Sequence, residues 1–337
     1  MNPSAGCDAL PEKLPSAQFQ IVERARATIA RYEMLEDGDS VVVGLSGGPD
    51  STCLLDVLRR CRIDLDIVVA HVDHGISDES EEVAARVSAT AAHDGYEVHL
   101  ARAHELSAPN LQAKARDFRY DFFDIVARQT GDAKVATGHT LDDRVETTLA
   151  RLLHGAGTGG VAGIPPHEAN RIRPLIDVRR AEARSYCDAL GLDYYDDPAN
   201  EDDTFERVAV RRRLVAAIEE RWGEGAIRAV ARSADRLRED SAALDELKER
   251  LYAGIAGGDE GGEITLQLAA IRSMPRALRR RVLEDAVGRI RDRAAGIDEV
   301  LDALERYDGA AHKSFDLAGG GTLRLEEDTI VVSRMPT

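Results

Sequence analysis

The sequence predicts an α/β fold, in which a doubly wound parallel sheet is followed by a smaller, mainly helical C-terminal domain. Short apolar runs rich in β-branched residues alternate with amphipathic helical patterns over the first 150 residues. This alternation is typical of a parallel sheet covered by helices on both faces. A glycine-rich turn, residues 46–51, directly follows the first apolar run. At 337 residues the chain is long enough to bury two hydrophobic cores.

The expected elements follow one another along the chain in a regular order. Strands are predicted at 41–45, 65–71, 96–101, 133–137 and 171–176. Helices are predicted at 18–35, 51–61, 78–94, 110–130, 142–154, 179–190, 206–221, 224–253, 276–293 and 296–307. We expect a glycine-rich mobile loop at 154–165 and a small hairpin-like tail at 314–333. The predicted domains are a disordered lead-in at 1–17, a domain at 18–203, and a second at 204–337.

The net charge of −17, taken by itself, argues against a nucleic-acid partner. Its distribution softens this argument, because 39 of the 44 basic residues are arginines, and 13 of these arginines are grouped within 171–184, 207–213 and 276–281. Such groups can meet phosphates locally. No apolar run reaches the ~20 residues of a membrane span, and the polar N-terminus lacks the pattern of a secretory signal. We therefore expect a cytoplasmic protein without a membrane partner.

The four cysteines are scattered, with no pair at metal-ligand spacing. They are Cys7, Cys53, Cys61 and Cys187. This spacing argues against a zinc ribbon and against a disulfide framework.

The most informative segment is the turn Ser46-Gly47-Gly48-Pro49-Asp50-Ser51, between the first strand and the first helix of the sheet. Free backbone N–H groups and the positive end of a helix dipole favour an anion at such a position. The glycines let the backbone approach an oxyanion closely. The turn is not a Walker loop, because no lysine follows the glycines in a GK[ST] pattern, and its glycines do not have the GxGxxG spacing. An ordinary strand–helix turn is the alternative.

Polar residues also follow two other strands and lie on two helices. His71 ends the second strand, where it would contact a nucleotide or metal, or cap the chain. Asp143 and Glu146 begin a helix three residues apart and share one face. We expect them to form an acidic pocket for Mg²⁺ or a cationic substrate. The alternative is that Asp142 and Asp143, in the first turn, merely complement the helix dipole. Arg116 and Arg119 share another helical face, which would reach phosphate or be solvated.

These motifs together resemble the PP-loop ATP pyrophosphatases and, within them, the tRNA(Ile)-lysidine synthetases. The matching motifs, in order, are SGGPDS, HVDHG, ARDFRY, ATGHTLDDRVET, LLHGAGTGGVAGI, RIRPLIDVRRAE and DDPANEDDTFERVAVRR. They cover residues 38–215, with a weaker likeness to the C-terminus. The resemblance implies a sheet of the adenine nucleotide α-hydrolase type. Val208 stands where the family pattern has Asn, which weakens the inference for that segment.

The resemblance implies a two-step reaction on the wobble cytidine of an isoleucine tRNA with a CAU anticodon. ATP adenylates the C2 oxygen, and the ε-amine of free lysine then displaces AMP to give lysidine. It implies ATP as substrate, Mg²⁺ as cofactor, and a homodimer, because family members are often dimers.

The resemblance also implies a role for each matching residue. The groups that hold ATP would be Ser46, Gly47, Gly48, Pro49, Asp50, Ser51, His71 and His139, with Asp50 also on Mg²⁺. Asp143 and Glu146 would bind the lysine ammonium, and Arg119 would steady the adenylated base; with Asp50 these are the expected catalytic residues. The tRNA contacts would be Arg116, Arg179, Arg207 and Arg211.

Three alternatives remain from the sequence. A PP-loop enzyme that thiolates tRNA usually needs paired cysteines, which the spacing here does not offer. A PP-loop synthetase acting on small molecules would leave the arginine-rich segment 171–213 without a purpose. A non-catalytic ATP- or tRNA-binding protein would not need both the turn at 46–51 and the acidic pair.

Overall fold

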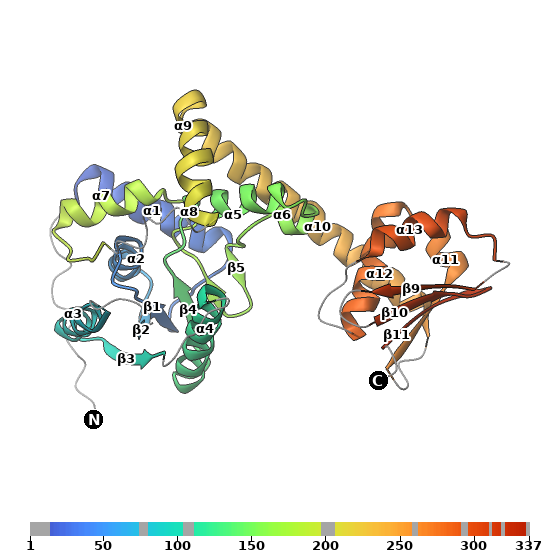
Figure 1. Cartoon of the computed structure of the whole chain (residues 1–337). Helices are drawn as coiled ribbons and strands as arrows, with labels where there is room; N and C mark the ends of the chain where they lie inside the picture. Colours follow the sequence, from blue (N-terminus) through green and yellow to red (C-terminus); the bar gives the residue numbers. More distant parts are fainter. Residues whose placement is uncertain are drawn as a thin grey trace. The chain divides into compact units, whose positions relative to one another are not determined.

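The computed structural model describes residues 14–73, 80–103, 111–196, 206–257, 262–290, 296–309, 312–317 and 321–334. Contacts divide the chain into two compact units, residues 1–236 and 237–337 (Figure 1). This division falls later than the predicted boundary near residue 203. The reason is that the helices after residue 206 pack against helix α5 of the first unit.

The first unit is built on a six-stranded sheet with the order β3-β2-β1-β4-β6-β5. Its strands are β1 (Asp39–Gly44), β2 (Leu65–Asp73), β3 (Glu97–Arg102), β4 (Lys134–Thr137), β5 (His167–Glu168) and β6 (Arg171–Ile172). All neighbouring pairs are parallel except β5 with β6. The predicted parallel sheet is confirmed, although the strand expected at 171–176 is only two residues long.

Helices cover both faces of this sheet. They are α1 (Ser16–Arg31), α2 (Pro49–Arg60), α3 (Ser80–His93), α4 (Leu111–Gln129), α5 (Leu141–Leu153) and α7 (Arg180–Leu190). Val41 and Val43 belong to the core shared with α1, α2, α3 and α7, whereas Val42 belongs to the core shared with α4. Side chains alternate along a strand, so a strand with both sets buried is covered twice.

The glycine-rich segment 154–165 differs from the predicted loop, because it contains one helical turn, α6 (Thr158–Val161). The Arg151 side chain of α5 donates to the carbonyl groups of Gly160 and Gly163, at 2.9 and 3.3 Å. A Cβ atom on Gly163 would lie 2.6 Å from the Thr148 hydroxyl, so only glycine allows this close approach. The segment is thus fastened to α5.

A second group of helices completes the first unit. They are α8 (Glu206–Ala209), the π-helical segment η2 (Val210–Val215), α9 (Ala216–Trp222) and the start of α10 (Glu224–Ile255). Leu141 and Val145 of α5 are buried in one cluster with Val210 and Val215 of η2. This apolar contact places the arginines of α8 and η2 beside the start of α5.

In its described residues, the second unit combines the C-terminal part of α10 and three further helices with a five-stranded antiparallel sheet of order β7-β8-β11-β10-β9. The strands are β7 (Ala256–Gly257), β8 (Glu263–Gln267), β9 (Lys313–Leu317), β10 (Gly321–Leu325) and β11 (Thr329–Arg334), and the helices are α11 (Leu268–Ser273), α12 (Arg276–Ile290) and α13 (Ile297–Arg306). The predicted hairpin-like tail is therefore three strands of a larger sheet, because β8 pairs with β11. In β10, buried and half-buried residues alternate, so one face carries the core.

The predicted lead-in at 1–17 lies mostly outside the described residues, and α1 already begins at Ser16. Among the helices that the structure describes, none is long and apolar enough to cross a membrane.

Candidate active site

The site lies where the sheet order reverses direction, between β1 and β4. The connections that leave these two strands run to opposite sides, which opens a crevice at their carboxyl ends. The turn at 46–51 follows β1, and Gly138 with His139 follows β4. A Cβ atom on Gly138 would lie 3.0 Å from the backbone of Asp50 and Ser51. A glycine at this position therefore lets the two connections touch.

Hydrogen bonds within the turn at 46–51 fix its conformation. Ser51 is buried, accepts a bond from the Ser46 N–H at 3.1 Å, and donates to the Gly48 carbonyl at 3.0 Å. Gly47 has φ +87°, a conformation that favours glycine, and Gly48 is the N-cap of α2. Ser46 is exposed. The start of α2 thus presents free N–H groups beside the exposed Ser46, as an anion site requires.

Asp50 lies in the first turn of α2 with one oxygen at the crevice. Its Oδ1 is buried and has no hydrogen-bond partner among the described residues, while its Oδ2 is 3.5 Å from Nε of Arg180. Burial raises the pKa of Asp50 to about 7, with help from the negative charge of Asp143 and against the pull of Arg180. An unpartnered carboxylate oxygen at such a turn is the kind of ligand that Mg²⁺ takes, together with phosphate oxygens. No cluster of three or more acidic, histidine or cysteine side chains that could hold a metal by itself occurs in the described part of the chain.

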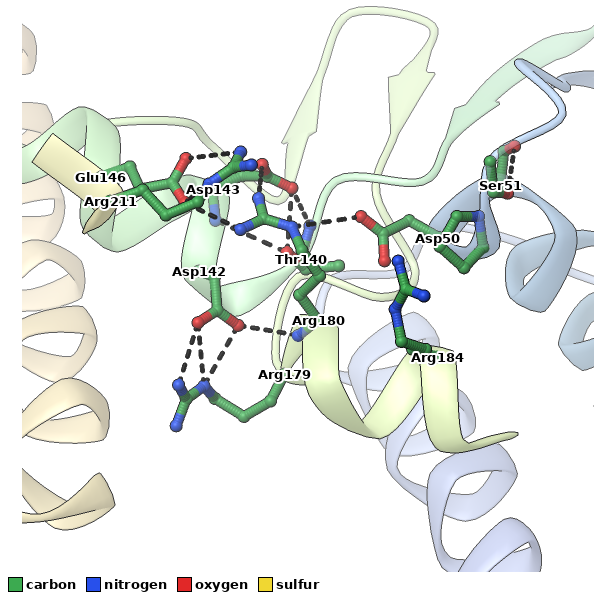
Figure 2. A network of polar contacts seen from close by, with 12 residues as sticks. Asp50, Ser51, Thr140, Asp142, Asp143, Glu146, Arg179, Arg180, Arg184 and Arg211 are labelled. Carbon is green, nitrogen blue, oxygen red and sulfur yellow. Dashed lines mark hydrogen bonds and ion pairs between the residues drawn. The ribbon is translucent and has the colours of Figure 1, made fainter. Parts of the chain in front are cut away.

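The acidic pair lies at the start of α5, facing Asp50 (Figure 2). Asp143 and Thr140 form a capping box, in which Asp143 Oδ2 accepts from the Thr140 N–H at 2.7 Å. The other oxygen, Oδ1, accepts from Arg180 at 2.5 Å and from Arg207 at 2.7 Å. Burial alone would raise the pKa of Asp143, but these two cations outweigh it and hold the pKa well below its usual value. Asp143 is therefore ionised.

Glu146 is fully buried, one helical turn further along α5. Its Oε1 accepts from Arg180 at 2.8 Å and from Arg211 at 2.7 Å, and its Oε2 accepts from Arg207 at 3.1 Å. The predicted pocket is thus lined by two carboxylates and closed by three guanidinium groups. Sequence reasoning missed Arg180, although the tandem Arg179-Arg180 before a helix was a visible signal.

Arg179, predicted to contact tRNA, is buried in a separate ion-pair group. Its Nε donates to both oxygens of Asp142 at 3.1 Å, and its NH1 donates to Glu219 of α9 at 3.0 Å. The Asp142 carboxylate also accepts from the Arg180 N–H at 2.7 Å. Arg179 therefore fastens α7 to α5 and α9, and the structure keeps it away from the open crevice.

His139 lies beside the acidic pair as a neutral ring. Burial lowers its pKa to about 3, against the opposing effect of Asp143 and with help from Arg173, Arg207 and Arg116. Its Nδ1 is 2.8 Å from the Thr137 hydroxyl. The same arginines show that a cationic group surrounds the end of β4.

Arg116 and Arg119 belong to that cationic group and come from α4. Their guanidinium carbons lie 5.0 and 5.7 Å from the ring centre of Tyr120. Burial lowers the pKa of Arg119, and the positive charges of Arg116 and Arg207 lower it further. Within the described ranges neither Arg116 nor Arg119 has an ion-pair partner among the acidic residues. The two therefore remain available for an anion.

His71 closes the other side of the turn at 46–51. Its pKa is lowered by burial, so the neutral ring donates from Nδ1 to the Leu45 carbonyl at 2.7 Å. The ring also lines an open cavity of about 740 Å³ with Asp73, Ser88 and Leu100. The rest of the HVDHG motif, His74 and Gly75, lies outside the described residues.

Comparison with known proteins agrees with this geometry. The family model described as a PP-loop domain matches residues 18–218. A tRNA(Ile)-lysidine synthase from Leifsonia xyli is 35% identical over 75% of this chain and 77% of the relative. One from Mycolicibacterium paratuberculosis is 36% identical over 88% of this chain and 92% of the relative.

Among solved structures, the fold resembles a U34-tRNA thiolase from Methanococcus maripaludis, with a TM-score of 0.55. The identity is 19%, over 66% of this chain and 80% of that chain, so this likeness shows the fold alone. The family model covers more than half of the present chain, and the two synthases are similar over most of it. The chain belongs to the tRNA(Ile)-lysidine synthase family of PP-loop proteins.

Proposed function

We propose that this protein uses ATP to join lysine to C2 of the wobble cytidine of a CAU-anticodon tRNA(Ile), through an adenylated cytidine. One observation carries the proposal. The turn at 46–51 and the acidic pair Asp143 and Glu146 face one crevice, and a single ion-pair cluster joins them through Asp50. This arrangement supports the proposal, because a site for a leaving diphosphate would lie beside a site for a cation.

In the first step, the C2 oxygen of the cytidine attacks the α-phosphate of ATP, and pyrophosphate leaves. The free N–H groups at the start of α2 would hold the diphosphate, and the adenosine would lie toward the cavity beside His71. Mg²⁺, which neutralises charge on the leaving group, would be held by Asp50 together with phosphate oxygens.

In the second step, the ε-amine of lysine attacks C2, and AMP leaves with the former C2 oxygen. Lysine arrives as an ammonium ion and must lose a proton to become a nucleophile. Asp143 and Glu146 would bind the ammonium, and Glu146 would receive that proton. Because three arginines already contact the pair, the ammonium has to displace part of this set, and Arg207 has the most exposed side chain of the three, at 42%.

The RNA would be held by cations around the crevice. Arg116 and Arg119 are available for an anion, and Arg207 and Arg211 lie on the outer helices α8 and η2. Phosphates of the anticodon loop would pair with them in a salt-dependent way. A homodimer and a cytoplasmic location stay predictions.

The described cysteines give no support to a thiolating enzyme. Cys53 and Cys187 contact each other, a pairing that the sequence spacing did not reveal, but both are buried. The contact with Cys187 and burial raise the pKa of the Cys53 thiol. A thiol that ionises poorly is a weak nucleophile for sulfur transfer.

The deciding experiment supplies ATP, Mg²⁺ and labelled lysine to the purified protein, with tRNA(Ile) carrying CAU. We expect label in this tRNA and release of pyrophosphate and AMP. The control is the methionine tRNA with the same anticodon, which should remain unlabelled. Equal labelling of both tRNAs, or none of either, would contradict the proposal.

Substitution of the buried carboxylate separates the two steps. In Glu146→Gln, pyrophosphate release should persist while lysine transfer falls about 100-fold, because an amide cannot accept the proton. Stopped-flow release of pyrophosphate and incorporation of labelled lysine measure the two steps. Unchanged lysine transfer would show that the acidic pair has another role.

A further inference from the structure

Arg180 occupies an unusual place between the two halves of the site. It is the first residue of α7, and its backbone N–H is fixed by Asp142 of α5. The neighbouring Arg179 turns to Asp142 and Glu219, while the side chain of Arg180 turns the other way, into the crevice (Figure 2). The backbone of Arg180 is therefore held independently of the contacts that its side chain makes.

The guanidinium of Arg180 reaches three carboxylates from two different helices. Its Nε is 3.5 Å from Asp50 of α2. Its NH2 and NH1 donate to Asp143 and Glu146 of α5, at 2.5 and 2.8 Å. Arg207 and Arg211 also bind the acidic pair, yet Arg180 alone among the described residues has an ion pair with both Asp50 and that pair. A planar group with five donors can span this spacing.

We propose that Arg180 is the positioning residue that sets the distance between the diphosphate half of the site and the amine half. This inference rests on the proposed function. Asp50 lies on the helix that would hold the phosphates, and Asp143 and Glu146 lie on the helix that would receive lysine. Arg180 keeps both helices at one spacing, so Asp50 stays in place for the first step, and the adenylated base and the amine meet in the geometry that the second step needs.

Loss of Arg180 has a specific physical consequence. The three carboxylates repel one another once the shared cation is gone, and they move apart or bind other cations. The diphosphate site at the start of α2 stays in place, and the acidic pair keeps Arg207 and Arg211. Binding of ATP and lysine should therefore change little, whereas the maximal rate of both steps should fall.

The experiment compares Arg180→Ala with the full-length wild type in tRNA-dependent pyrophosphate release and in lysine transfer. We expect each maximal rate to fall about 100-fold and each KM to stay within about threefold. Added guanidinium ion should restore activity at least about tenfold, because it fills the vacated space between the carboxylates. Methylammonium, with a single charged nitrogen, should not restore it.

Two further variants control for folding. Arg24→Ala removes a 2.6 Å ion pair to Glu182 in the first turn of the same helix, with no contact to the crevice, and it should keep both rates within about twofold. Arg180→Lys keeps the charge without the fork, and it should stay at least about tenfold below wild type.

Several results would overturn the inference. They are wild-type rates in Arg180→Ala, full activity in Arg180→Lys, a loss confined to KM, and failure of guanidinium to restore a folded Arg180→Ala protein. Failure of the proposed function looks different, because the wild type itself would then transfer no lysine.

Discussion

The two units of this protein bury different kinds of side chain. In the first unit, the start of α5 buries three charged residues in succession, Asp142, Asp143 and Arg144, and then Glu146. In the second unit, Lys248, paired with Asp285, is the single buried charged side chain among the described residues, and ion pairs such as Arg280 with Asp298 lie at the surface. Buried charges cost desolvation free energy unless each is paired. These buried charges are concentrated at the carboxyl end of the parallel sheet, where the candidate active site lies. We infer that they serve the reaction at a cost in folding stability.

Arg144 is an example of a buried charge at the start of α5 that is only partly paired. Among the described residues it is one of the largest fully buried side chains, and it pairs with Asp235 of α10 and donates to the Ala231 carbonyl at 3.0 Å. Its Nε and NH1 have no hydrogen-bond partner in the described structure. A hydrophobic residue would avoid that cost, so stability alone does not explain an arginine next to the acidic pair.

The strongest test of this comparison removes one charge from the crevice. Asp50→Asn preserves the shape of the side chain but loses the proposed metal ligand and the charge that Arg180 contacts. We expect pyrophosphate release to fall more than about 1,000-fold, while the unfolding temperature stays within a few degrees. Pyrophosphate release at saturating tRNA measures the rate, and calorimetry measures the unfolding temperature. A variant that remains active would remove Asp50 from the chemistry.

A core substitution in the second unit should have the opposite profile. Leu283 of α12 is fully buried in the apolar core, so Leu283→Ala creates a cavity that costs about 3 kcal/mol of unfolding free energy. Urea unfolding measures this loss. The rate of pyrophosphate release at saturating tRNA should stay within about twofold of wild type. A large loss of rate in the folded variant would contradict the assignment of catalysis to the first unit alone.

The smallest expected effect concerns pH and the first unit. The pKa of His139 falls from its ordinary value of 6.5 to about 3 on folding, so the unfolded chain binds this proton more readily. The resulting stability is present above pH 6.5 and is lost as pH falls toward 3. Between pH 7 and pH 5 we expect a loss of about 2 kcal/mol from this group. Urea unfolding of His139→Gln should lack this part of the loss, and an unchanged pH dependence would mean that the ring is solvated.

The strands and the crevice of the first unit could be predicted because their signals are local. The apolar run at Val41–Val43 predicted a buried strand, and both of its faces are indeed buried. Residues 46–51 predicted the turn that follows it. The spacing of Asp143 and Glu146 gave one helical face. Each of these patterns lies within a few residues, where periodicity and turn chemistry decide the structure.

The arginines around the acidic pair could not be predicted in the same way. Arg180 is 34 residues from Glu146 in sequence, and Arg211 is 65 residues away, so their contacts depend on how α7 and η2 pack. Strand β8 was missed because five residues beside a glycine-rich segment carry little pattern, and only its pairing with β11 makes it a strand. The late division at residue 236 likewise follows from packing of α8 and η2 on α5.

The π-helical segment η2 makes this part of the chain sensitive to length. Val210 and Val215 are both buried in the cluster with α5, yet residues five apart in an α-helix point about 140° away from each other. The wider turn of a π-helix brings them to the same side, as if one extra residue had been inserted into an ordinary helix. Deleting a single residue there would rotate the helical residues that follow η2 relative to Arg207. A deletion in this segment should therefore disturb the structure more than most substitutions.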